Sequence, residues 1–386
     1  MAQRERGPSS PLLLPGRYHP LPTPLTYAGQ KAGVTIETVG YSDVTKLLTL
    51  LVGGAPLDFA TLAGGIIATL GWKGALTNLT AYLERDRELM REVRWERMFP
   101  DELEQAFAAC PLLYFTYGLC EPHGPHNALG LDELKAHGLA CAAAHSTGGI
   151  VAPPSFWHIH GFGGYNIWAE RMVGETPRPW LSCVPPWVFF RNVCYQVRTA
   201  DMLGFHAALF ITGHYGRHSL DFKRLVELLQ PHVGTRLFFL QDSEANRPGF
   251  DSDGKSSGDH AGKVETSLLW ALEPDCVDVS RLPPPGTPIP QFGMGPTAHQ
   301  SNRLVGERMA ADIVRNLGAK GQELLAEYDR LQPRHTFRTF ADVEEFWSAE
   351  VQPKLGQFAC MQESWDGSPA PSVDSVWREN WQVSGQ

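Results

Sequence analysis

The chain has 386 residues, of which 43% are hydrophobic and 19% charged, and its formal net charge is -9. These proportions are typical of a globular, enzyme-sized protein. The negative charge argues against nucleic acid and anionic membrane surfaces as partners, because both require a basic face on the protein. The stretch 47–76 is apolar, but glycines, a proline and an aspartate interrupt it, which disfavours a membrane span.

Residues 1–93 are predicted to form an N-terminal extension, with a Pro-rich arm over 1–30 and helices over 43–93. The arm carries only a three-leucine apolar run before Pro15, which is too short for the core of a signal peptide. The seven cysteines include no CxxC pair, a pattern typical of reduced thiols. We therefore expect a cytoplasmic protein.

From residue 94 to about 330 the pattern changes to strands that alternate with helices. This alternation predicts an α/β fold, a three-layer α/β/α sandwich with a mostly parallel sheet. Residues 331–386 are Trp-rich and are predicted to form an irregular C-terminal extension. The strands are expected at 111–119, 149–154, 206–213 and 235–242, and the helices at 100–110, 132–145, 189–203, 219–232, 262–272 and 300–328.

The first candidate site residues directly follow the strand predicted at 111–119. Glu121 and His123 lie two residues apart, so in an extended turn their side chains can point the same way. Asp132 follows at the start of the next predicted helix, where capping of that helix is an alternative role. Ligands of α/β proteins bind at the carboxyl ends of strands, which places all three residues at the expected edge of the sheet.

Two further segments carry histidine or carboxylate side chains. His214 lies between glycines after the strand predicted at 206–213, and Asp259, His260 and Glu265 lie where a loop enters a helix. Carboxylate and imidazole ligands together suit Zn²⁺, Mn²⁺ or Fe²⁺ better than Ca²⁺. The sequence therefore predicts a site for a divalent metal, with one or two ions per subunit.

The three segments resemble the creatininase family, whose motifs read E-x-H-G-P-H with a following Asp, then N-G-H-x-G-N, then H-A-G-x-x-E-T-S. In this chain they stand as Glu121-Pro-His-Gly-Pro-His126 with Asp132, Thr212-Gly-His-Tyr-Gly-Arg217, and His260-Ala-Gly-Lys-Val-Glu-Thr-Ser267. The resemblance covers about residues 94–318. It implies a creatininase-like fold and a homo-oligomer, with a hexamer possible.

The resemblance also implies roles for individual residues. Glu121, His123, Asp132 and His214 would bind metal, with Asp132 as the bridge. Creatininase proper has a further Glu where this chain has Gly216, and Glu265 is the candidate replacement. His260 would transfer the proton, oriented by Asp259. The residues expected near the substrate are Tyr215, His126, Trp157 and His160; for Trp157 and His160, packing within a loop or an interface remains the alternative.

The implied activity is that of a metal-dependent amidohydrolase, which cleaves a C–N bond in a small, cyclic substrate with metal-activated water. Thr212 and Arg217 replace asparagines of the family motif, and the family's F-P-G-T segment is not visible, so creatinine itself is not expected as the substrate. Two alternatives stay open. One is hydrolytic C–C ring opening of a cyclic polyol ketone, and the other is a non-catalytic, metal-binding oligomeric protein that keeps the fold.

Overall fold

The computed structural model describes residues 92–246 and 259–378, together with two short strands near the N-terminus. The chain divides into two compact units, Met1–Arg91 and Glu92–Gln386. In the first unit, β1 (Leu12–Pro15) and β2 (Thr38–Tyr41) pair in parallel. The helices predicted over 43–93 and most of the Pro-rich arm lie outside the described residues.

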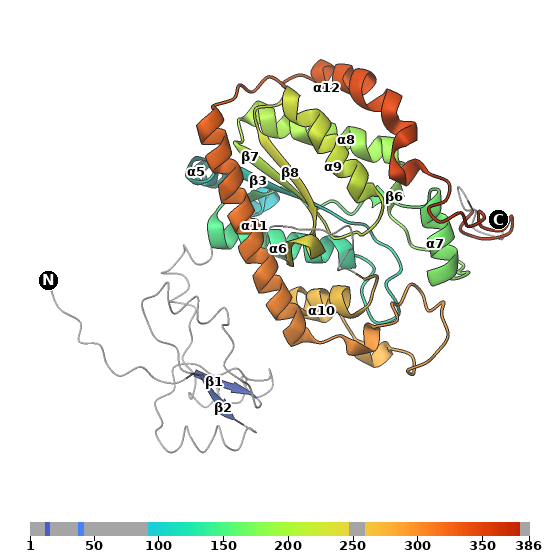
Figure 1. The fold of residues 1–386 in the computed structure, drawn as a ribbon. Helices are drawn as coiled ribbons and strands as arrows, with labels where there is room; N and C mark the ends of the chain where they lie inside the picture. Colours follow the sequence, from blue (N-terminus) through green and yellow to red (C-terminus); the bar gives the residue numbers. More distant parts are fainter. Residues whose placement is uncertain (1–11, 16–37, 42–91, 247–258, 379–386) are drawn as a thin grey trace, which may run out of the picture. The chain divides into compact units, whose positions relative to one another are not determined.

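A four-stranded parallel sheet lies at the centre of the second unit, with the strand order β4-β3-β7-β8 (Figure 1). Its strands are β3 (Leu112–Tyr117), β4 (Ile150–Val151), β7 (Ala207–Thr212) and β8 (Arg236–Gln241). Every residue of β3 and β7 is buried, as expected for parallel strands that helices cover on both faces. The predicted parallel sheet is confirmed.

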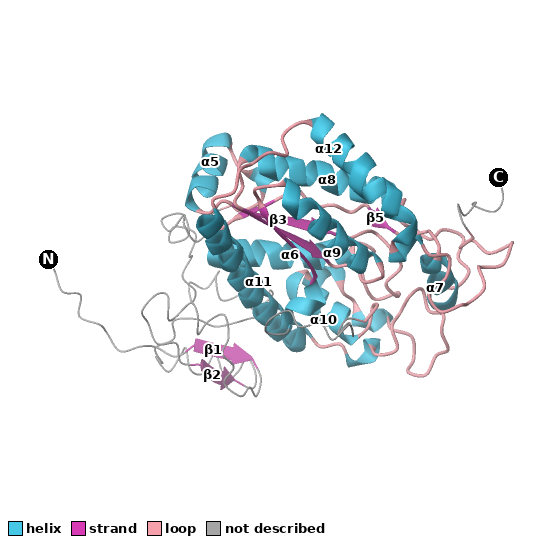
Figure 2. Cartoon of the chain, turned by 45° about the horizontal axis from the view of Figure 1, so that its top comes forward, coloured by secondary structure: helices cyan, strands magenta, loops and turns pink. Residues whose placement is uncertain are grey.

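Helices pack on both faces of this sheet (Figures 1 and 2). Leu113 and Phe115 of β3 belong to one hydrophobic cluster, and Leu112 and Tyr114 belong to the cluster on the other face. The predicted layered α/β fold is therefore confirmed. The first face packs against α5 (Pro100–Ala109), α8 (Pro186–Leu203) and α9 (His218–Leu229), and the second against α6 (Leu131–Thr147), α10 (Lys263–Leu272) and α11 (Arg303–Leu331).

Several elements were not predicted. The aromatic-rich segment after β4 contains helix α7 (Gly164–Met172) and a parallel pair of two-residue strands, β5 (His158–Ile159) and β6 (Cys183–Val184). The C-terminal extension, which was expected to be irregular, contains helix α12 (Phe340–Phe346). Where the structure describes them, the segments between these elements are loops and short helical turns.

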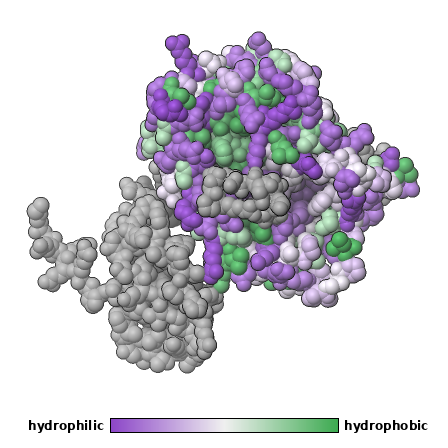
Figure 3. Space-filling model, in the orientation of Figure 1, coloured by the Kyte–Doolittle hydropathy of each residue, from purple (hydrophilic) through white to green (hydrophobic). Residues whose placement is uncertain are grey.

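The C-terminal extension packs on its own chain. Phe346 and Phe358 lie in the hydrophobic cluster under α8 and α9, and Trp377 is fully buried beside α7. The carboxylate of Asp221 on α9 accepts the backbone N–H groups of Ala359 and Cys360. None of the described helices is long and apolar enough to cross a membrane. Figure 3 shows polar residues over most of the visible face of the second unit, with apolar side chains in separate patches.

Candidate metal centre

The loop that follows β3 places Glu121 and His123 at the carboxyl edge of the sheet. Both side chains are at most 1% exposed. His123 Nδ1 lies 3.0 Å from the backbone carbonyl of Glu121. Because a carbonyl only accepts, Nδ1 carries a hydrogen, and Nε2 is the nitrogen that points toward the other site residues.

Asp132 and His214 approach this pair from α6 and from the end of β7. Asp132 Oδ1 lies 3.2 Å from His123 Nε2, and its Oδ2 lies 3.3 Å from His214 Nδ1. His214 Nδ1 also lies 3.0 Å from Glu121 Oε1. Asp132 is fully buried in the first turn of α6 and makes no capping hydrogen bond there. Both of its carboxylate oxygens are therefore available to the other side chains of the site or to a ligand.

Glu265 completes the cluster from the first turn of α10. Its Oε2 lies 3.7 Å from His123 Nε2 and accepts the backbone N–H of Ala261 at 2.7 Å. Ala261 has a φ of 46°, a left-handed conformation that is uncommon outside glycine. This bend turns its N–H back toward the Glu265 carboxylate.

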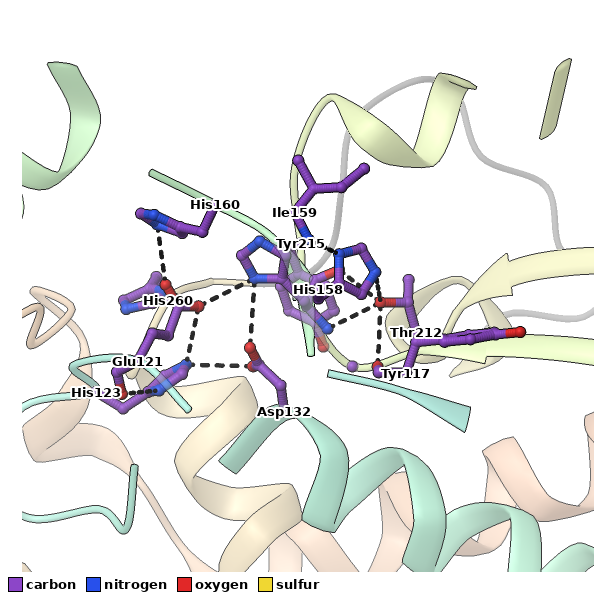
Figure 4. A network of polar contacts seen from close by, with 12 residues as sticks. Tyr117, Glu121, His123, Asp132, His158, Ile159, His160, Thr212, Tyr215 and His260 are labelled. Atoms are coloured by element: carbon purple, nitrogen blue, oxygen red, sulfur yellow. Dashed lines mark hydrogen bonds and ion pairs between the residues drawn. The ribbon is translucent and has the colours of Figure 1, made fainter. Parts of the chain in front are cut away.

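The five side chains form two groups that share Asp132. Figure 4 shows three of them, Glu121, His123 and Asp132, directed toward one another. One group is Glu121, Asp132 and His214, and the other is His123, Asp132 and Glu265; within each, the candidate ligand atoms lie within 4.8 Å of one another. Among the described residues, Glu121 Oε1, His123 Nε2 and both oxygens of Asp132 have no hydrogen-bond partner although they are buried. Buried acceptors without donors fit divalent cations of the Zn²⁺, Mn²⁺ or Fe²⁺ type.

The neighbouring carboxylates raise the pKa values of both His123 and His214. Burial lowers the pKa of His123, but the charges of Asp132, Glu121 and Glu265 outweigh burial and raise it to about 9. Burial likewise lowers the pKa of His214, and Glu121 and Asp132 raise it to about 10. In the metal-free protein, protonated imidazoles therefore balance the carboxylates. Metal ions would take the place of those protons.

His260 lies beside the cluster, and its ring stacks on that of His123 with the centroids 4.3 Å apart. Its Nε2 donates to the carbonyl of Pro122 at 2.9 Å, which leaves the lone pair of Nδ1 facing Glu121 Oε1 at 3.9 Å. Burial, together with His123, lowers the pKa of His260 to about 4. The ring is therefore neutral at pH 7.

Asp259 does not orient the His260 ring. Its carboxylate accepts the backbone N–H groups of Val264 and Glu265 and the hydroxyl of Thr297. Asp259 therefore caps the first turn of α10, and the Pro122 carbonyl holds the His260 ring instead. The sequence-based role of Asp259 is corrected to one in placing Glu265.

Of the residues expected near the substrate, His160 lies at the cluster. Its Nδ1 accepts the N–H of Gly161 at 2.7 Å, so its Nε2 carries the hydrogen and lies 3.2 Å from Glu121 Oε2. Trp168 on α7 also contacts the site, with its ring edge-on to His260 at 4.5 Å. Trp157, by contrast, is 59% exposed. Trp168 is thus the tryptophan that the structure brings to the site histidines.

Tyr215 and His126 are engaged elsewhere. The Tyr215 hydroxyl donates to Asp242 Oδ1 at 2.5 Å. His126 Nε2 lies 3.1 Å from the hydroxyl of Thr266 on α10, so His126 connects the loop after β3 to that helix. His126 is buried and Tyr215 is partly buried, and the hydrogen bonds of both support the segments around the site.

Two further groups also lie within metal-binding distance: Glu121 with His123 and His260, and the three imidazoles of His158, His214 and His218. The rings of His214 and His218 are almost parallel, at 5°, so their lone pairs do not converge on one point. Both nitrogens of His218 are used, one with the Tyr165 hydroxyl at 2.5 Å and one with the His214 carbonyl at 3.2 Å. His218 therefore supports the loop that carries His214.

Sequence reasoning missed Lys135, which is fully buried next to the cluster. Its Nζ lies 3.1 Å from Glu265 Oε1 and 3.2 Å from Asp242 Oδ2. The available signal was its spacing, because a residue three positions after Asp132 lies on the same face of the helix.

Comparison with known proteins identifies the family. The family model described as "Creatininase: Creatinine amidohydrolase" matches residues 96–327, which is more than half of the chain. The chain belongs to the creatininase family. Members of this family are metal-dependent amidohydrolases, so the family and the enzyme class expected from the sequence are both confirmed.

Several solved creatininase structures are similar to this chain. A crystal structure of creatinine amidohydrolase is 21% identical, covers 61% of this chain and 98% of its own, and has a TM-score of 0.48. A creatininase with Mn is 20% identical, with 60% and 98% covered and a TM-score of 0.48. A mutant creatininase of the Zn-Zn type is 21% identical, with 60% and 98% covered and a TM-score of 0.48. No curated protein matches the chain.

Proposed function

We propose that this creatininase-family protein hydrolyses a C–N bond of amide type in a small, cyclic substrate. The observation that carries the proposal is the pair of donor groups that share Asp132, because such a pair suits two divalent ions held close together. All five candidate ligands are at most 3% exposed, which suits a substrate small enough to reach a buried site. The family supports the amide-type bond.

In this proposal, Glu121, Asp132 and His214 would hold one ion, and His123, Asp132 and Glu265 would hold the other. Glu265 takes the place of the ligand that creatininase proper has at the position of Gly216. Bound divalent ions would polarise the substrate carbonyl and make water acidic enough to supply hydroxide near neutral pH. The ions proposed are Zn²⁺, Mn²⁺ or Fe²⁺, which suit carboxylate and imidazole ligands.

His260 is proposed to move the proton. Its neutral ring presents the Nδ1 lone pair toward the carboxylate cluster, because Nε2 is held by the Pro122 carbonyl. Nδ1 would accept a proton from the attacking water and then give it to the leaving nitrogen. His160 would keep Glu121 in place through its Nε2–H, and Trp168 would form an aromatic wall beside His260 that suits a planar ring.

We also propose that the protein is a homo-oligomer, for which the family resemblance allows a hexamer. Exposed apolar side chains on α8, Trp187 and Val188, would be candidates for such an interface. Light scattering on the full-length protein tests this part. A monomer at micromolar concentration would contradict it.

A substrate screen tests the proposed reaction. Purified protein, loaded with Mn²⁺ or Zn²⁺, is assayed on cyclic amides, formamides and cyclic polyol ketones. We expect turnover of a C–N substrate that a chelator abolishes and added metal restores. Turnover of ketones alone would favour C–C ring opening instead. Protein that binds no metal and gains no activity from it would favour a non-catalytic role.

A further inference from the structure

Lys135 lies buried at the meeting point of three segments that carry candidate ligands. Its Nζ donates to the backbone carbonyl of Gly213 at 2.6 Å and to Glu265 Oε1 at 3.1 Å. It also lies 3.2 Å from Asp242 Oδ2 and 3.9 Å from the centroid of the Tyr215 ring. A buried ammonium group is costly unless it is paired and hydrogen-bonded, and here every side of it has an acceptor or an aromatic face.

These contacts connect Lys135 to the metal centre along the chain as well as in space. Lys135 follows Asp132 by one helical turn, and Gly213 directly precedes His214. Glu265 is held at both oxygens: Oε1 faces Lys135, and Oε2 accepts the Ala261 N–H. Only Oε2 therefore lies toward His123, at 3.7 Å. The carboxylate has one orientation, and it presents one oxygen to the site.

Asp242, which directly follows β8, provides a buried negative charge beside the ammonium group of Lys135. Its Oδ1 accepts the Tyr215 hydroxyl and its Oδ2 faces Lys135, and Asp242 belongs to neither donor group that shares Asp132. Lys135 and Asp242 balance each other's charge. The carboxylates of Glu121, Asp132 and Glu265 are then available to bind divalent cations.

We propose that Lys135 is a positioning residue that fixes Glu265 as a single-oxygen ligand of the His123–Asp132–Glu265 position and so sets its affinity for a divalent cation. This arrangement would compensate for Gly216, where the chain has no carboxylate to offer. The inference rests on the proposed function, in which the two donor groups bind cations. A nucleophilic role does not fit Lys135, because its ammonium group contacts two carboxylates and a carbonyl.

The test compares four full-length proteins: wild type, Lys135→Met, Asp242→Asn and the double variant. Each is freed of metal and titrated with Mn²⁺ by calorimetry, and its folding is checked by circular dichroism and thermal unfolding. The double variant removes one charge of each sign, so it keeps the buried charges balanced and decides the question if Lys135→Met alone does not fold.

We expect wild type to bind Mn²⁺ in two steps. In Lys135→Met and in the double variant, the second step should weaken by about tenfold or more, and the first should change by less than about threefold, because outer supports of metal ligands typically contribute about 10–100-fold in affinity. Asp242→Asn alone should leave both steps nearly unchanged.

Two results would overturn the inference. If the second step in the double variant is as tight as in wild type, Lys135 only balances the charge of Asp242. If Asp242→Asn alone weakens the second step as much as the double variant does, Asp242 rather than Lys135 holds Glu265. Failure of the proposed function looks different, because wild type itself would then bind no Mn²⁺.

Discussion

The orientation of each imidazole around the cluster follows from the hydrogen bond of its other nitrogen. His123 and His260 each donate one N–H to a backbone carbonyl of the loop after β3, and His160 accepts a backbone N–H. The remaining nitrogen of His260 is left as an acceptor, that of His123 becomes one when a cation replaces its proton, and that of His160 is a donor. His123 can therefore ligate a cation, His260 can take a proton, and His160 can donate to Glu121.

His260→Ala tests the division between metal binding and proton transfer. We expect turnover to fall by about 100-fold or more, the typical contribution of general acid–base catalysis, because the side chain that accepts the proton is gone. His260 lies within metal-binding distance of Glu121 and His123, but both groups that share Asp132 are complete without it, so the metal content should be unchanged. Elemental analysis and steady-state kinetics on the same preparation check both points. A variant that loses its metal would mean that His260 is a ligand.

Glu133 gives a prediction about pH. Burial raises its pKa well above 4.5, and hydrogen bonds from the Thr116 hydroxyl and the Ser155 N–H only partly offset this effect. The folded protein holds the proton more tightly than the unfolded chain. Glu133 therefore favours the folded state fully below about pH 4.5, and this contribution is lost as the pH rises toward the folded-state pKa.

Glu133→Gln stays neutral at every pH and keeps the oxygen that accepts these hydrogen bonds. The melting temperature of the variant, relative to that of wild type, should therefore increase as the pH rises from about 5 to about 8. Thermal unfolding of metal-free protein at several pH values measures the difference. A difference that stays constant over this range would show that Glu133 is ionised throughout.

Among single residues, the sequence predicted that Glu121, His123, Asp132, His214 and Glu265 share one site, and the structure brings these five side chains together. It did not predict their supports. In the sequence, Lys135 looks like an ordinary lysine of a helix. Its role becomes visible only when the structure shows that its side of α6 is buried. Asp259 stands next to His260 in the chain, but adjacent side chains rarely share a partner, and its carboxylate is directed to the backbone of α10 instead.

Among the elements, α6 begins directly against the ends of β3 and β7, and two glycines make this possible. A Cβ on Gly213 would lie 2.0 Å from the carbonyl oxygen of Asp132, and one on Gly118 would lie 2.2 Å from the backbone nitrogen of Glu133. No side chain fits at either position. These close contacts place the Asp132 carboxylate within reach of both His123 and His214.

Gly213→Ala tests this packing, with Gly356→Ala as its control because nothing lies within 4 Å of a Cβ at Gly356. We expect Gly213→Ala to lower the free energy of unfolding by about 1–3 kcal/mol, the usual cost of overpacking, and to weaken metal binding by displacing Asp132. The control should change neither. Denaturant unfolding and metal titration measure the two effects. Equal behaviour of the two variants would contradict the close approach of α6.

Long periodic elements were predicted well because a buried parallel strand is a continuous apolar run, as in β3 and β7. Helix α7 was missed because it starts after paired glycines in an aromatic-rich segment, a pattern that is typical of loops. A signal for α12 was present in Thr339 and Asp342, which form a capping box. The short length of that helix hid its periodicity.

For the whole molecule, the division at Arg91 and Glu92 lies close to the boundary predicted between residues 93 and 94. Residues 92–386 contain the described sheet, both hydrophobic clusters on its faces and all five candidate ligands. We therefore expect a chain of residues 92–386 alone to fold and to bind as much metal as the full-length protein.

Circular dichroism, thermal unfolding and elemental analysis of the shortened chain check this expectation. The outcome also bears on the N-terminal extension. A shortened chain that is unfolded, or that loses its metal, would show that residues 1–91 are part of the catalytic unit rather than an addition to it.

The shared carboxylate of Asp132 is the centre of the whole account, and the metal content of Asp132→Ala tests it most directly. Because Asp132 belongs to both donor groups, its removal should weaken both positions together. We predict about two ions per chain for metal-replete wild type and close to none for Asp132→Ala, measured by elemental analysis of folded protein. A wild type without metal, or an Asp132→Ala variant that still holds two ions, would contradict the account.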